Sequence, residues 1–119
     1  MAEMKIGDET FNVETEGPAD APVLMISNSL GSNLHMWDDQ IPALSKHFRI
    51  VRYDSRGHGE SAAPAGPYSL EQLGKDALAI LDALGVRKAH WMGLSKGGAV
   101  GQWLLLNAPD RIERAVLAN

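Results

Sequence analysis

Cysteine is absent from all 119 residues of the chain. Its absence excludes disulfides and thiolate metal sites, and it suits a reducing compartment. No apolar run approaches the length of a membrane span, and residues 1–5 are too charged and too few for a secretory signal. Lysine and arginine form no cluster, and the net charge is −4 with the two signs mixed. We therefore expect a soluble, cytoplasmic domain that binds neither membrane nor nucleic acid.

The chain is long enough for one hydrophobic core and too short for two. A hairpin is expected around Gly7, and after it apolar runs of strand length alternate with stretches of helical spacing. This alternation predicts an α/β fold with a mostly parallel sheet of about six strands and helices on both faces. The expected strands after the hairpin are 23–27, 48–53, 88–94 and 112–118, and the expected helices are 37–47, 69–84 and 96–107.

Ser95 lies at the centre of the pentapeptide Gly-Leu-Ser-Lys-Gly, directly after an expected strand and directly before an expected helix. This is the G-x-S-x-G nucleophile elbow in the strand–turn–helix context that gives the motif its meaning. The turn must hold the serine at positive φ, which an ordinary residue adopts only under constraint. Gly93 and Gly97 remove the Cβ atoms that would collide as strand and helix close on each other. A serine without a catalytic role in a tight helix entry is the alternative.

The helix after Ser95 predicts how it packs. Ala99 and Trp103 follow Ser95 at intervals of four residues, and we expect them to face the sheet. Gly98 and Gly101 allow a close approach to the strands. The segment lacks the Gly-Lys-Ser/Thr ending of a phosphate-binding loop, so a nucleotide site is not expected.

The whole chain resembles the first part of an α/β-hydrolase-fold enzyme. Four segments carry the resemblance in the expected order: 23–31, 54–61, the elbow and 107–119. Within that superfamily, Ser-Asn-Ser-Leu-Gly at 27–31, Leu-His-Met-Trp at 34–37 and Gly-Gln-Trp at 101–103 look like the 3-oxoadipate enol-lactonases, which open an enol-lactone ring in aromatic catabolism. The resemblance implies an eight-stranded parent sheet, of which residues 1–119 form the amino-terminal part.

The resemblance also assigns the chemistry. Ser95 is the nucleophile of a serine hydrolase of small esters or lactones, and the backbone N–H groups of Leu30 and Lys96 form the oxyanion hole; no cofactor or metal is implied. The family's lid, triad acid and triad histidine lie outside this sequence, where only Asp110 and Glu113 follow Ser95 as acids and no histidine follows. We therefore expect the chain alone to be inactive, and to pair with a complementing carboxy-terminal portion or with itself.

Several residues carry more than one interpretation. The Lys96 side chain either attracts an anionic substrate or lies solvated at the pocket wall, and the second is favoured; a role as general base ranks low. Asp54 ends a strand, where chemistry is common, but a structural role is favoured. The four histidines match no metal-binding spacing. His58 lies in a turn that the resemblance assigns to structure, and His35 lies near the oxyanion loop, where packing is favoured over substrate contact.

Two other functions remain open from the sequence. Hydrolysis of C–C bonds and cofactor-free haloperoxidase-like chemistry share every motif found here. The chain is otherwise a non-catalytic folded fragment that self-associates through an exposed sheet edge and sheet face.

Overall fold

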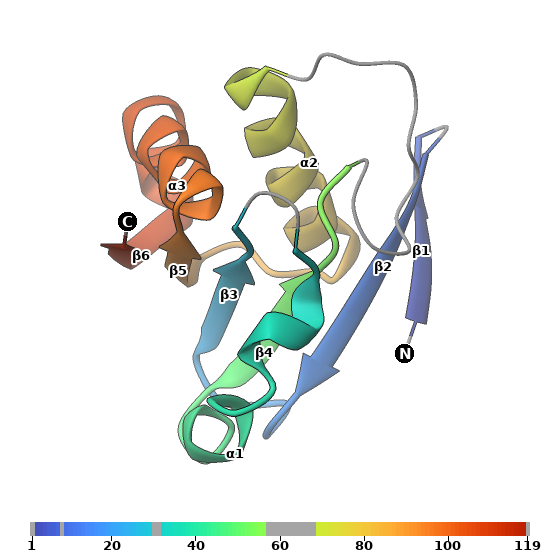
Figure 1. Ribbon diagram of the computed structural model, residues 1–119, viewed down its shortest axis with the longest axis vertical. Coiled ribbons are helices and arrows are strands. Elements are labelled where there is room, and N and C mark those ends of the chain that lie inside the picture. The colour runs from blue at the N-terminus through green and yellow to red at the C-terminus, as the bar shows by residue number, and fades with distance from the viewer. Residues whose placement is uncertain (1, 8, 30–31, 57–68, 119) are drawn as a thin grey trace.

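The computed structural model describes residues 2–7, 9–29, 32–56 and 69–118. Within these residues, six strands form one sheet in the order β1-β2-β4-β3-β5-β6 (Figure 1). The first three strands in this order are antiparallel, and β4, β3, β5 and β6 are parallel. The strands are β1 (Ala2–Ile6), β2 (Glu9–Glu16), β3 (Val23–Ser27), β4 (Arg49–Tyr53), β5 (Ala89–Leu94) and β6 (Ile112–Ala118). The helical elements are η1 (Leu34–Trp37), α1 (Ile41–Leu44), α2 (Leu70–Ala83), α3 (Lys96–Asn107) and η2 (Pro109–Arg111).

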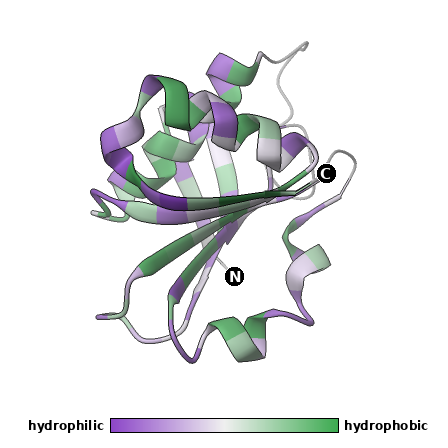
Figure 2. Ribbon diagram, turned by 90° about the vertical axis from the view of Figure 1, so that its left-hand side faces the viewer, coloured by the Kyte–Doolittle hydropathy of each residue, from purple (hydrophilic) through white to green (hydrophobic). Residues whose placement is uncertain are grey.

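The predicted α/β fold is confirmed, with helical elements on both faces of the sheet. The long helices α2 and α3 cover one face, and the short elements η1 and α1 lie on the other (Figure 2). Burial alternates along β5 and so distinguishes the two faces. Ala89, Trp91 and Gly93 are buried beneath the long helices. His90 and Met92, on the opposite face, are partly exposed. No helix in the described part of the chain is both long enough and apolar enough to cross a bilayer.

Two apolar clusters lie on the two faces of the sheet. The larger cluster joins the sheet to α2 and α3 and includes Phe11, Met25, Ile80, Trp91 and Leu104. The smaller cluster joins β3 and β4 to η1 and α1. It is built from Leu24, Ile26, Trp37, Ile41 and Ile50.

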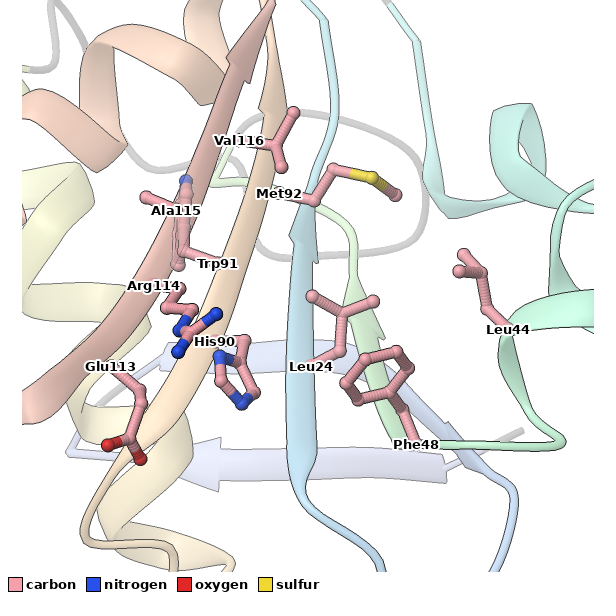
Figure 3. A pocket seen from close by; sticks show the side chains of 10 residues that line it. All are labelled: Leu24, Leu44, Phe48, His90, Trp91, Met92, Glu113, Arg114, Ala115 and Val116. Atoms are coloured by element: carbon pink, nitrogen blue, oxygen red, sulfur yellow. The ribbon is translucent and has the colours of Figure 1, made fainter.

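The second face is covered over β3 and β4 but open over β5 and β6. A groove of about 630 Å³ lies there, with Met92 and Val116 on the strands and Leu44 and Phe48 across from them (Figure 3). Val116 is 60% exposed. Because β6 is the last strand in the sheet order, its outer edge has no neighbouring strand among the described residues.

The expected helix from 37 to 47 is wrong. The structure has instead a 3-10 turn, η1, capped by the Asn33 side chain, followed by the single turn α1. Pro42 explains the interruption, because in a helix beginning at Trp37 it would lie in the interior. There its missing N–H would leave the carbonyl of Asp38 unpaired and its ring would clash with that carbonyl. In the structure Pro42 lies in the first turn of α1, where no N–H is needed.

The bounds of α3 and β6 agree with prediction, but the prediction that Trp103 faces the sheet was wrong. Gly97, Gly98, Gly101 and Leu104 face the sheet; a Cβ on Gly101 would collide with the Trp91 indole. Trp103 instead packs against Gly74 of α2. The elbow fixes Gly97 against the sheet, so the residues four and seven positions later share its face, and Trp103 is turned toward the neighbouring helix.

Candidate active site

Ser95 joins the end of β5 to the start of α3 in a constrained backbone conformation. Its φ is 56° and its ψ is −109°, and among the described residues no other non-glycine residue has a positive φ. Such a conformation costs on the order of 1–3 kcal/mol and persists only where its surroundings enforce it. Two backbone hydrogen bonds do so: Ser95 N–H donates to the Ala118 carbonyl (2.8 Å), and the Ser95 carbonyl accepts from the Ala99 N–H (3.1 Å).

Gly93 and Gly97 lie where the main chains of β5, α3 and β3 come very close together. A Cβ on Gly93 would collide with the main chain of Gly97, and a Cβ on Gly97 would collide with the main chain of Ser27 at the end of β3. Ser27 is also the register partner of Gly93 across the sheet. The elbow therefore lies directly against the end of β3, at the start of the loop that contains Leu30.

The Ser95 hydroxyl takes no part in holding the turn. It makes no capping hydrogen bond to α3, and the residue is exposed. Ser95 lines a small pocket of about 240 Å³ together with Gly98, Ala99, Gln102, Leu117 and Ala118. A residue that lines a pocket at the carboxyl end of a parallel strand suits chemistry in an open α/β sheet.

The predicted oxyanion donors differ in how well the structure describes them. The Lys96 N–H is the first of α3, and the first N–H groups of a helix have no intrahelical acceptor and lie at its positive end. Leu30 lies outside the described residues. Of the described residues near it, Ser32 donates from its hydroxyl to the Ser29 carbonyl (2.8 Å). Both oxyanion assignments stay predictions.

The Lys96 side chain is half-buried, and burial lowers the pKa of its ammonium group. Whether it attracts an anionic substrate or lies solvated at the pocket wall stays open. No ion pair of Lys96 is found in the part of the chain that the structure describes. A poorly hydrated cation beside the nucleophile attracts anions more strongly than a solvated one.

Asp54 has the structural environment that the sequence favoured. Its carboxylate is buried, accepting from the Leu34 N–H (2.8 Å) and from Asn12 Nδ2 (3.0 Å). His35 pairs with Asp38 at the surface, and His90 lies edge-on against Phe48, far along β5 from the elbow. His58 lies outside the described residues. Residues 2–7, 9–29, 32–56 and 69–118 contain no group of three potential metal ligands.

Sequence reasoning missed a set of contacts around Asn28. This side chain is 1% exposed, donates from Nδ2 to the Tyr53 carbonyl (2.7 Å) and accepts at Oδ1 from Trp37 Nε1 (2.9 Å). The only available signal was a polar residue directly after the buried strand Val23–Ser27. A buried amide needs partners, but the sequence does not show which ones.

Comparison with known proteins gives consistent matches. A family model described as alpha/beta hydrolase fold matches residues 22–119. The 3-oxoadipate enol-lactonase 2 of Acinetobacter baylyi is 46% identical over 112 residues, covering 94% of this chain and 42% of that protein.

Two solved structures are also similar, each with a TM-score of 0.95. A hydrolase from Pseudomonas aeruginosa PA01 is 56% identical, with 98% of this chain and 44% of the other covered. The enol-lactonase from Burkholderia xenovorans LB400 is 45% identical, with 98% and 45% covered. The chain thus spans less than half the length of the proteins it matches.

Proposed function

The chain belongs to the alpha/beta hydrolase fold family, and from that premise we propose that it carries the nucleophile of a serine hydrolase of small carboxylic esters or lactones. One observation carries the proposal: Ser95 is held at positive φ between β5 and α3, is exposed, and lines a pocket. The enol-lactonase names of two relatives support the substrate class.

The proposed reaction begins with attack of Ser95 Oγ on the carbonyl carbon while a base takes the hydroxyl proton. The carbonyl oxygen becomes an oxyanion beside the N–H groups of Lys96 and Leu30. Collapse of this intermediate breaks the ester C–O bond, and the leaving oxygen takes a proton. Water then hydrolyses the acyl-enzyme and restores the serine.

We further propose that the base and its acid come from polypeptide outside residues 1–119, so that this chain alone has little or no turnover. His35 pairs with Asp38 and His90 packs against Phe48, and among the described residues no hydrogen bond joins a histidine to Ser95. A serine hydroxyl without a base in hydrogen-bond reach loses on the order of 10²–10⁴ in rate.

The proposed substrate is 3-oxoadipate enol-lactone, acted on in the cytoplasm during aromatic catabolism. Its free carboxylate is an anion that the half-buried Lys96 ammonium suits. The enol-lactonase relatives from Acinetobacter baylyi and Burkholderia xenovorans support this assignment.

The test is a fusion of residues 1–119 to the remaining part of the Burkholderia xenovorans enol-lactonase, assayed for enol-lactone opening. We expect turnover in the fusion and a loss of on the order of 10³-fold or more in kcat on Ser95→Ala. Ser45→Ala, a serine in the turn after α1, is the matched control and should leave turnover unchanged. Equal turnover in the Ser95→Ala protein would reject the proposal.

A second candidate function is self-association of the chain through its open face. The groove over β5 and β6 favours it, with Val116 exposed there, and so does the edge of β6, which has no neighbouring strand among the described residues. We propose that a second copy packs on this face when no complementing polypeptide does.

A further inference from the structure

The end of β4 holds the segment that follows β3. Three consecutive residues contribute: Arg52, Tyr53 and Asp54. Tyr53 does so twice, through a hydrogen bond between its hydroxyl and Ser27 Oγ (3.0 Å) and through its carbonyl, which accepts from Asn28.

Asn28 is the centre of this arrangement because it uses both ends of its amide. Its Nδ2 donates to β4 at Tyr53, and its Oδ1 accepts from the indole of Trp37 at the end of η1. One buried side chain therefore ties the loop after β3 to a strand on one side and to a helical turn on the other. Hydrophobic packing alone would not fix this register, because hydrogen bonds are directional.

A second anchor fixes the far end of the segment. The N–H of Leu34 donates to Asp54 Oδ1 (2.8 Å), and its carbonyl accepts from Arg52 Nη1 (3.0 Å). The backbone N–H and carbonyl of the buried Leu34 are thus both satisfied, one by Asp54 directly after β4 and the other by Arg52 on β4. Arg52 is itself held by a bidentate pair with Glu16.

The Met36 sulfur of η1 also contacts the described residues of the loop after β3. Met36 Sδ accepts from the Ser29 N–H (3.4 Å), and it lies 3.1 Å from the Ser32 hydroxyl oxygen. The described residues on either side of Leu30 and Gly31 are therefore fastened to the same turn.

The elbow lies beside the first anchor. Gly97 lies so close to Ser27, the residue directly before Asn28, that a Cβ on Gly97 would collide with the Ser27 backbone. A shift of Asn28 would change the separation between the loop and the Lys96 N–H, and these are the two sources of the predicted oxyanion donors. Donors of this kind act only when placed within hydrogen-bond distance of the developing charge.

We infer that Asn28 is a positioning residue for the oxyanion hole: its two hydrogen bonds, to Tyr53 and Trp37, set the loop after β3 at its working distance from the elbow. The inference rests on the proposed function. It assigns Asn28 an effect on kcat through the loop, and no contact with substrate.

The first experiment follows hydrogen exchange in the 119-residue chain by NMR. In Asn28→Ala the Trp37 indole N–H and the Ser29 amide should exchange about tenfold faster or more, since both lose their fixed neighbours. Asn107→Ala removes an exposed amide at the end of α3 and should leave both rates unchanged. Unchanged exchange in Asn28→Ala would overturn the inference, whatever the activity of the chain.

The second experiment measures kcat and KM in the fusion with the Burkholderia xenovorans part. Asn28→Ala should lower kcat about 10- to 100-fold, because a displacement near 1 Å of a catalytic donor has an effect of this size. KM should change less than about twofold, because ground-state binding is untouched. Ile80→Val weakens the core under α2 away from the loop, and it should lower stability without this kcat effect.

Trp37→Phe is the milder variant if Asn28→Ala does not fold. It keeps an aromatic ring in the core while it removes the Nε1–H donor and part of the indole, so it should give a smaller loss in kcat in the same direction. An unchanged kcat in both variants, while Ser95→Ala abolishes turnover, would overturn the inference and leave the proposed function standing. Turnover that survives Ser95→Ala would instead reject the proposed function, and the exchange rates would still decide whether Asn28 anchors the loop.

Discussion

Ser95 has a strained backbone conformation, and its hydroxyl makes no capping hydrogen bond to α3. The hydrogen bond to Ala118 ties the strained residue to β6, so the free energy stored at the turn depends on the neighbouring strand as well as on the motif. Asn28 and Asp54 are the opposite case, because their side-chain polar atoms form hydrogen bonds that hold the structure. The proposed nucleophile is thus a residue whose side chain makes no structural hydrogen bond to its helix, whereas its neighbours in the site use theirs for structure.

Tyr53 gives a pH dependence that reports on this buried polar cluster. Burial, with a smaller contribution from Asp76, raises the pKa of Tyr53 to about 12, and the hydrogen bond with Ser27 opposes the rise. In the unfolded chain the phenol ionises near its ordinary value of about 10. Its contribution to stability is therefore fully present below pH 10 and is lost as the pH rises toward 12.

We expect the wild-type chain to lose about 2 kcal/mol relative to Tyr53→Phe between pH 10 and pH 12. Near pH 7 the order is reversed: Tyr53→Phe should be less stable by about 1 kcal/mol, because Ser27 loses its partner. Urea unfolding at a series of pH values measures both. A constant difference across that range would show that the phenol is not buried as described.

The elements of the sheet show which features local pattern can predict. Short apolar runs gave the parallel strands, and the glycine spacing gave the elbow and α3, because these depend on near neighbours in sequence. The helix expected over 37–47 was wrong because Pro42 outweighs the acidic residues before it. The contacts of Asn28 could not be predicted, since its partner Tyr53 is 25 positions away.

At the junction of β3, β5 and α3, Gly97 limits how the elements approach. Alanine is normally the better helix residue by up to about 1 kcal/mol. Here we expect Gly97→Ala to destabilise the chain by about 1–3 kcal/mol, because its Cβ would meet the backbone of Ser27.

Gly85→Ala is the control for that substitution. A Cβ on Gly85 meets nothing within 4 Å, so this variant pays only for its positive φ, about 1–2 kcal/mol. Circular dichroism melts compare the two variants for stability. In the fusion, Gly97→Ala should also lower kcat, whereas Gly85→Ala should not; equal kcat values would mean that the packing at Gly97 does not position the elbow.

One face of the sheet is covered by helices, and the other face is open over β5 and β6. Beneath α2 and α3 the core is closed, whereas the groove over β5 and β6 exposes Met92 and Val116. The relatives that share the fold are more than twice as long. An open apolar face beside an unpaired strand edge favours association with another polypeptide.

We expect light scattering to show an average mass that rises with the concentration of the 119-residue chain. Val116→Lys should shift the chain toward monomer, because it places a charge in the groove that a second copy would cover. Leu106→Lys is the matched control, since Leu106 is 82% exposed on α3, away from the groove. A chain that stays monomeric at high concentration, or two variants that behave alike, would count against the open face as the interface.

The nucleophile is tested most directly by trapping it. The fusion protein is treated with an activated phosphonate, which esterifies a reactive serine and loses its leaving group, and the adduct is located by peptide mass spectrometry. The account predicts one adduct per molecule, on the peptide that contains Ser95, and none in Ser95→Ala. An adduct on another serine, or labelling that survives the substitution, would contradict it.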